Sequence, residues 1–328
     1  MKAFLTKNLM QAMSCYIILY LLTGCGTGKQ SDQENIESEL KGTISISGAF
    51  ALYPITTKWA DEFQMVHPKV RIDISAGGAG KGMTDALSGI VDLGMFSRGI
   101  HQEEIDKGCW WVAVAKDAVL PTIHAENPWM DDLLKGGITK AVFQKVFLEE
   151  GPVSWSEIVS KPGLPNINVY IRSDACGAAQ MWGEYLGKDQ ESLHGIGVFG
   201  DPGLAHAVKK DIYGLGFNNL NYLFDMKTRT FYHKIRVVPI DLNDNGVIEE
   251  EEDFYATLDD VMAAIRSGIY PSPPARELFF VSKGKPQNKI AIEFLNWILT
   301  EGQQFVHEAG YVELKDEIIE NELNKINR

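Results

Sequence analysis

Short strand patterns that alternate with helical patterns constrain the fold of this chain more than any other feature. Residues 43–47 alternate polar and apolar side chains, as a half-buried strand does. A helical pattern follows at once, in which Ile55, Trp59, Phe63 and Val66 recur every three or four residues. This segment therefore predicts a strand followed by an amphipathic helix.

The same alternation continues to residue 96. Residues 70–74 predict a second strand, and a glycine-rich turn at 77–82 leads into a helix that reaches residue 90. Residues 91–96 predict a third strand. Strands separated by helices in this way indicate an open α/β sheet.

A second region begins after residues 112–115, which predict a strand leaving the first region. Pairs of glycine and proline punctuate residues 127–163. Further strands are predicted at 168–171, 214–217 and 277–282, and a long amphipathic helix from about residue 287. The chain has 328 residues, which suits two lobes better than one core.

Composition excludes one class of partner. The formal net charge is −13, and no block of Lys and Arg is long enough to neutralise a row of phosphates, so we expect no nucleic acid partner. A small anion remains compatible with this charge, because one arginine and a few backbone N–H groups act at short range.

The N-terminus has the layout of an export signal. Lys2 and Lys7 precede a mostly apolar run at 9–22, which is shorter than a usual transmembrane helix. The run ends at Gly24-Cys25, which resembles a lipobox. We expect residues 1–24 to be a lipoprotein signal peptide, Cys25 to be lipidated, and residues 25–41 to form a polar tether. The alternative is an ordinary signal peptide with an incidental cysteine.

Three turns share one design, in which a strand ends, small residues turn the chain and a helix begins. They lie at residues 47–51, 77–82 and 174–178. The first N–H groups of a helix have no partner within the helix, and they favour negative charge. Three such turns directed at one point would form an anion site.

The chain resembles the phosphate-type substrate-binding proteins of ABC importers, which have the type II periplasmic-binding-protein fold. The matching segments follow one another in order between residues 42 and 313. They are residues 47–48, 53–54, 58–60, 77–82, 91–98, 155–158, 172–174, 214–217, 302–303 and 310–312.

The resemblance implies two α/β lobes with a hinge that the chain crosses twice. Lobe 1 would comprise residues 42–114 and 275–328, and lobe 2 residues 115–274. It implies a non-enzymatic protein that captures phosphate or a related oxyanion, needs no cofactor and delivers its ligand to an ABC permease. It also implies an exported protein, anchored to a membrane by its lipid and facing the periplasm or the cell surface.

The resemblance also implies a set of ligand-binding residues. They are Ala49, Phe50, Ala51, Ala79, Gly80, Ser97, Arg98, Arg172, Asp174, Cys176, Gly177 and Ala178.

This sequence departs from the family pattern within that set. The family usually supplies hydroxyls at four positions, where this chain has Phe50 or Ala51, then Ala79, Cys176 and Ala178. The retained arginines still indicate an anion, because a guanidinium can pair with two oxygens at once.

Two of the charged residues in the set have alternative roles. Arg98 could bind the ligand or pair with a nearby acid at the surface. Asp174 could accept a proton from the ligand or orient Arg172, and we favour the second role.

Two other functions remain open. The missing hydroxyls would suit the same fold binding a different small anion or a carboxylate. A surface lipoprotein with a calcium-dependent role in adhesion or signalling is the other alternative.

Residues 241–252 match the spacing of a twelve-residue calcium loop, with an apolar residue at position eight. The expected ligands are Asp241, Asn243, Asn245, the carbonyl of Val247, and Glu252. The segment before the loop, residues 235–240, predicts a strand and not the helix of an EF-hand. Calcium would be structural here, and the alternative is an acidic turn that caps a helix near Phe254.

Two cysteines remain in the expected mature chain, Cys109 and Cys176. They could form a bridge in an oxidising compartment, although the sequence gives no geometry that supports one.

Overall fold

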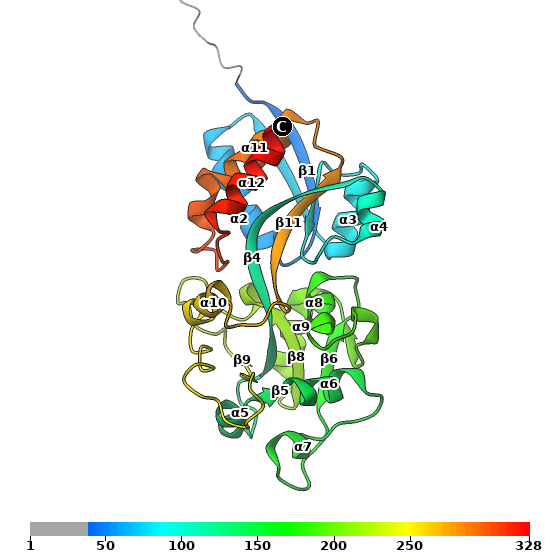
Figure 1. Ribbon diagram of the computed structural model, residues 1–328, viewed down its shortest axis with the longest axis vertical. Coiled ribbons are helices and arrows are strands. Elements are labelled where there is room, and N and C mark those ends of the chain that lie inside the picture. Colours follow the sequence, from blue (N-terminus) through cyan, green and yellow to red (C-terminus); the bar gives the residue numbers. More distant parts are fainter. Residues whose placement is uncertain (1–38) are drawn as a thin grey trace, which may run out of the picture. The chain divides into compact units, whose positions relative to one another are not determined.

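The computed structural model describes residues 39–328, and Leu40–Arg328 forms one compact unit (Figure 1). The expected signal peptide and Cys25 lie outside the described residues, as does nearly all of the expected tether.

Strands and helices alternate along the first part of the described chain, as the sequence predicts. The elements are β1 (Gly42–Gly48), α2 (Tyr53–Val66), β2 (Val70–Ala76), α3 (Ala79–Leu87), β3 (Leu93–Phe96), α4 (Gln102–Asp106) and the long β4 (Cys109–His124).

The middle of the chain continues with shorter strands. Its elements are α5 (Met130–Gly136), β5 (Ile138–Thr139), α6 (Lys140–Leu148), α7 (Trp155–Val159), β6 (Asn168–Arg172), α8 (Gly177–Tyr185), β7 (Ile196–Val198), α9 (Gly200–Lys210), β8 (Gly214–Asn219), β9 (Ile235–Val237), β10 (Ile240–Asp241) and α10 (Leu258–Ser267).

The last elements return to the first part of the structure. They are β11 (Ala275–Lys283), α11 (Lys289–Leu299) and α12 (Asp316–Asn327); short 3-10 helices lie at Gln190–Ser192, Leu220–Tyr222 and Glu301–Phe305.

One predicted helix ends earlier than expected. The sequence predicted a helix that reached Ile90, but α3 ends at Leu87 and Ile90 is 67% exposed. Gly89 has φ +70°, a left-handed conformation that ends a helix and turns the chain. The prediction was therefore wrong at its C-terminal end.

Nine of the described strands form one mixed sheet, and β5 and β10 pair in a separate two-stranded sheet. The strand order of the larger sheet is β2-β1-β3-β11-β4-β8-β6-β7, with β9 paired to β4. β1 is parallel to β2 and β3, whereas β11 runs antiparallel to β3 and β4. β4 and β11 run side by side from one group of elements to the other (Figure 1).

The buried apolar side chains fall into two clusters. One draws on residues 44–115 and 278–326, and we call the structure around it lobe 1. The other draws mainly on residues 118–275, together with Val312, and surrounds lobe 2. β4 and β11 contribute to both clusters, so these strands connect the lobes.

Helix α2 shows how the pattern produces lobe 1. Pro54 lies in its first turn, where the missing N–H costs nothing. Ile55, Trp59 and Phe63 are buried on one face, and the indole N–H of Trp59 donates to the carbonyl of Gly302 at 2.8 Å. Helices α2, α11 and α12 lie on one side of the lobe 1 strands, with α3 and α4 on the other (Figure 1).

Among residues 39–328, no helix combines the length and the apolar character that crossing a membrane requires.

Candidate ligand-binding site

The first two turns lie side by side in lobe 1. The carbonyl of Gly48 accepts hydrogen bonds from the N–H groups of Gly77 at 2.9 Å and Gly78 at 3.1 Å. Gly48 has φ +132°, and a Cβ there would lie 2.3 Å from the Met95 carbonyl oxygen. Only glycine fits this position, because both the backbone conformation and the space exclude a side chain.

The third turn, in lobe 2, contacts the second turn and Ser97, the residue that follows β3. The N–H of Gly80 donates to the carbonyl of Ala175 at 3.1 Å. A Cβ on Gly177 would lie 2.1 Å from the carbonyl oxygen of Ser97 and 2.3 Å from its Oγ. The structure therefore brings the three predicted turns together, with the lobes closed against each other.

Helix N-termini supply N–H groups at these turns. Ala79 is the first residue of α3, and Gly177 and Ala178 are the first residues of α8. Their N–H groups have no carbonyl partner within the helix, and the positive ends of the two helix dipoles lie at the same place. This arrangement favours a negatively charged group at the junction of the turns.

Arg172, at the end of β6, is held by two carboxylates. Its Nε donates to Asp174 Oδ1 at 2.8 Å and its Nη2 to Asp174 Oδ2 at 2.5 Å, while Nη1 donates to Asp201. Its side chain is 1% exposed. Three of the five guanidinium N–H groups are used, which leaves two for a ligand. Asp174 therefore pairs with Arg172 through both carboxylate oxygens, as the orienting role that we favoured from the sequence requires.

Buried polar groups continue from Arg172 to the strands that join the lobes. Asp201 Oδ1 accepts from Asn219 Nδ2 at 2.6 Å, and Asn219 Oδ1 accepts from Arg276 Nη2 at 2.5 Å. Arg276, on β11, also donates to Asp117, on β4, at 3.4 Å. The candidate site and the interlobe strands thus share one hydrogen-bonded network.

This network is short of positive charge. It holds three carboxylates, those of Asp117, Asp174 and Asp201, against the guanidinium groups of Arg172 and Arg276. Burial raises the pKa of Asp117 to about 6, although Arg276 acts in the opposite direction. One carboxylate of the network therefore takes up a proton more readily than an ordinary aspartate.

The raised pKa of Asp117 predicts a pH-dependent stability. Because the folded state holds this proton more tightly than the unfolded chain does, the stabilisation is complete below the ordinary pKa of 3.8 and is lost as the pH rises through about 6. The loss is about 3 kcal/mol at most. Urea denaturation between pH 4 and pH 7 should show this slope in the wild type and not in Asp117→Asn. An equal slope in the variant would contradict this origin.

Arg98 is engaged elsewhere. Its two Nη atoms donate to the Glu104 carboxylate at 2.7 and 3.1 Å, and the guanidinium lies over the Phe96 ring. This is the surface-acid pairing that the sequence left open as the alternative. A ligand role for Arg98 stays a prediction that its contacts do not favour.

Cys176 occupies one of the positions where the family usually has a hydroxyl. It is the N-cap residue of α8, and its Sγ accepts from the N–H of Ala179 at 3.4 Å. Burial raises the pKa of its thiol to about 12, so the thiol stays protonated. Cys109 and Cys176 are both free, so they do not form the bridge that the sequence allowed.

The remaining residues of the first turn also have partners. The N–H of Ala49 donates to the Met95 carbonyl at 2.9 Å, and the carbonyl of Ala51 accepts from the Tyr311 hydroxyl at 2.7 Å. The Phe50 ring centroid lies 5.6 Å from Cζ of Arg172. The first turn thus places an aromatic ring over the guanidinium.

Sequence reasoning missed four members of the buried network, which are Asp117, Asp201, Asn219 and Arg276. A signal was present for two of them. Asp117 interrupts the apolar run of β4, and Arg276 lies at the start of the apolar run of β11. A charge inside a buried strand needs a partner, so these two residues could have been paired from the sequence.

Comparison with known proteins supports this description. The family model described as PBP superfamily domain matches residues 33–301. "Protein SphX" of Synechococcus elongatus is 25% identical over 289 residues, 84% of this chain and 79% of that protein. "Phosphate-binding protein PstS" of Staphylococcus epidermidis is 23% identical over 300 residues, 89% of this chain and 84% of that protein.

A solved structure shares the fold. The putative phosphate ABC transporter substrate-binding protein of Clostridium perfringens, solved with bound phosphate, superposes with a TM-score of 0.68. It is 23% identical, and the match covers 84% of this chain and all of that chain. This likeness confirms the predicted α/β architecture of two lobes, between which the chain passes twice.

The fold and the converging turns define a two-lobed binding protein of the α/β class. The chain belongs to the PBP superfamily.

Proposed function

We propose that this protein captures phosphate or a related oxyanion between its lobes and delivers it to an ABC importer. The observation that carries the proposal is Arg172, buried and oriented by Asp174 and Asp201 at the turn where the helix N-termini of both lobes meet. The names of the curated relatives and the phosphate bound in the solved neighbour support the same ligand.

The geometry suggests how capture works. With the lobes apart, the ligand reaches the turns of one lobe. Rotation about β4 and β11 then brings the N–H groups of Ala79, from lobe 1, and Gly177, from lobe 2, around it. Exclusion of water strengthens each charge-assisted hydrogen bond, and each is worth about 1.5–3 kcal/mol. No covalent chemistry is needed, so we propose a non-enzymatic role without a required cofactor.

A panel of anions tests the proposal. Millimolar phosphate should raise the melting temperature of a protein that comprises residues 26–328. Sulfate, molybdate and small carboxylates should raise it less or not at all. Ligand that binds only the folded state at 100 times its Kd stabilises by about 2.7 kcal/mol. If a carboxylate gave the largest gain, the ligand class would be wrong while the fold-based role stood.

Membrane attachment is a separate part of the proposal. Cys25 follows the apolar run at 9–22 and precedes a polar segment. This order fits a lipid on Cys25 that inserts into the membrane and holds the folded protein outside it. The anchor would hold the protein near the permease, on the periplasmic or cell-surface side. Cys25→Ser should release the protein from washed membranes, whereas unchanged membrane retention and mass would refute lipidation.

We also propose a structural calcium ion in the 241–252 loop. Asp241 is 1% exposed, and its carboxylate accepts from the N–H groups of Asn245 and Gly246 at 3.3 and 2.8 Å. Glu252 is buried and reaches back to the N–H of Leu242 at 2.7 Å. The first and last expected ligands therefore both turn into the loop.

The remaining loop geometry fits the same pattern. Gly246, the sixth position, has φ +78°, as the sharp turn requires. Among residues 39–328, no group of three or more His, Cys, Asp or Glu is placed to hold a metal. Three of the five expected ligands here are amide or carbonyl oxygens. Helix α10 starts at Leu258, so the loop does not cap a helix near Phe254.

Calcium should therefore stabilise the protein. We expect millimolar calcium to raise the melting temperature of the wild type and EGTA to reverse the effect. Asp241→Asn keeps the acceptor oxygen but removes a ligand charge, so it should abolish the response. Glu250→Gln makes the same charge change at an exposed position that is not expected to ligate, and it should respond as the wild type does. An equal change in melting temperature in all three proteins would exclude this loop as the calcium site.

A further inference from the structure

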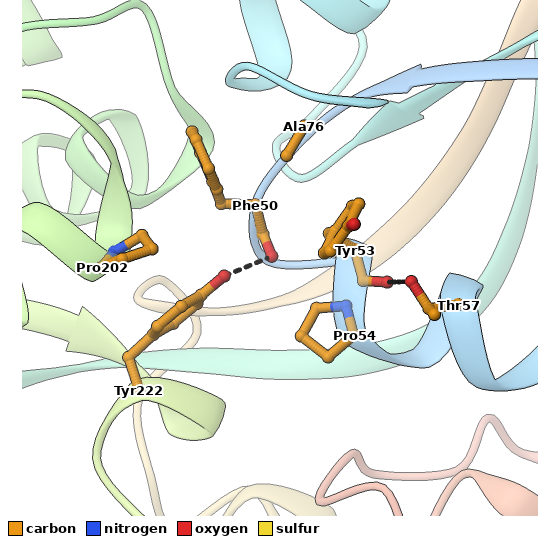
Figure 2. Close-up of a pocket in the computed structure, with 7 residues that line it drawn as sticks. All are labelled: Phe50, Tyr53, Pro54, Thr57, Ala76, Pro202 and Tyr222. Atoms are coloured by element: carbon orange, nitrogen blue, oxygen red, sulfur yellow. Dashed lines mark hydrogen bonds between the residues drawn. The ribbon is translucent and has the colours of Figure 1, made fainter. Parts of the chain in front are cut away.

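An apolar cavity of about 580 Å³ lies beside the first turn (Figure 2). Its wall is formed by Phe50, Tyr53, Pro54, Thr57, Ala76, Pro202 and Tyr222. The last two residues belong to lobe 2 and the others to lobe 1, so both lobes build the wall. Its volume lies within the range of pockets that hold small organic ligands.

Two of the three side-chain hydroxyls of this wall, those of Tyr222 and Thr57, are already hydrogen-bonded. The Tyr222 hydroxyl donates to the Phe50 carbonyl at 3.0 Å, and the Thr57 hydroxyl donates to the Tyr53 carbonyl at 3.0 Å (Figure 2). The wall offers mainly aromatic and prolyl carbon to an occupant. A bare inorganic ion would gain little from these carbon atoms, whereas an aromatic or alkyl group would be removed from water.

Phe50 connects this cavity to the anion site. Its backbone belongs to the first turn, and its ring lies over the guanidinium of Arg172. The same ring packs edge-on against Phe199, with centroids 6.0 Å apart. The cavity is therefore separated from an anionic group bound at the turns by the Phe50 side chain alone.

The donors at the turns suit a substituted anion. A free phosphate presents four oxygens, and enclosure requires a partner for each of them. No hydroxyl is available from Ala79, Cys176 or Ala178, and the Cys176 thiol accepts from the N–H of Ala179 as the cap of α8. A phosphate with one organic substituent presents three terminal oxygens and so needs fewer donors.

We propose that the preferred substrates are monosubstituted phosphorus oxyanions, phosphate monoesters or phosphonates, whose organic group occupies this cavity. This inference rests on the proposed function, because it assigns the phosphorus oxyanion to the same turns.

Calorimetry with three probes tests the inference. We expect phenylphosphonate to bind residues 26–328 at least about tenfold more tightly than methylphosphonate or inorganic phosphate, because the ring is buried. Thr57→Phe fills the cavity from α2. It should remove this preference without weakening the binding of inorganic phosphate. Thr84→Phe, on the exposed face of α3, is the matched control and should keep the preference.

The outcomes separate the two proposals. If inorganic phosphate binds as tightly as phenylphosphonate, or if Thr57→Phe keeps the preference, the inference is wrong and the proposed function stands. If none of the three probes binds, the proposed function fails and the inference fails with it.

Discussion

Arg172→Ala is expected to abolish anion binding and to destabilise the protein by about 3–5 kcal/mol, because it removes one partner of a buried ion pair. Two carboxylates, those of Asp174 and Asp201, would remain buried without the cation that both now contact. Calorimetry gives the loss of binding, and urea denaturation in the absence of ligand gives the loss of stability. The two readouts separate the binding role from the structural one.

Arg98→Ala is the matched control for this substitution. Arg98 is also a partly enclosed arginine near the turns, but Glu104 holds its guanidinium. We expect anion affinity within a few-fold of the wild type. If Arg98→Ala abolished binding while Arg172→Ala retained it, the site would have to be placed around β3 instead of β6.

Gly177→Ala is expected to weaken ligand binding by at least about tenfold, a free-energy cost of about 1.4 kcal/mol. The added Cβ would lie 2.1 Å from the Ser97 carbonyl oxygen, which belongs to the other lobe. Because helix α8 accepts alanine at its first residue, each lobe should keep its fold while full closure is blocked. Small-angle scattering in saturating phosphate should show a larger radius of gyration than the wild type.

Gly99→Ala provides the control for Gly177→Ala. Gly99 lies two residues beyond Ser97, and a Cβ there meets nothing within 4 Å. Affinity and scattering should match the wild type. If the Gly177→Ala protein had the wild-type radius of gyration in saturating phosphate, its lobes would close normally. The contact between Ser97 and the third turn would then not belong to the bound state.

The local elements of lobe 1 were predictable because their patterns are short-range. The spacing of Ile55, Trp59 and Phe63 defines the buried face of α2, and all three are fully buried. The end of α3 was not predictable from apolar spacing, because Ile90 continues the helical pattern beyond a glycine turn. Backbone conformation at Gly89 decided that boundary.

The candidate site was predictable only in part, for a similar reason. Strand-turn-helix units identify N–H groups locally, so the three turns and the pair of Arg172 with Asp174 could be found in the sequence. The contact of Arg172 with Asp201 joins residues that local patterns do not connect. Arg98 was a candidate beside Arg172 in the sequence, with a surface ion pair as its alternative, and the position of Glu104 favours that alternative.

Titration of residues 26–328 with inorganic phosphate by isothermal calorimetry tests most directly whether the lobes form an anion clamp around Arg172. We predict saturable binding of one phosphate per chain that disappears in Arg172→Ala and persists in Arg98→Ala. Binding that is unchanged in Arg172→Ala, or no heat of binding with phosphate at millimolar concentration, would contradict the proposed clamp.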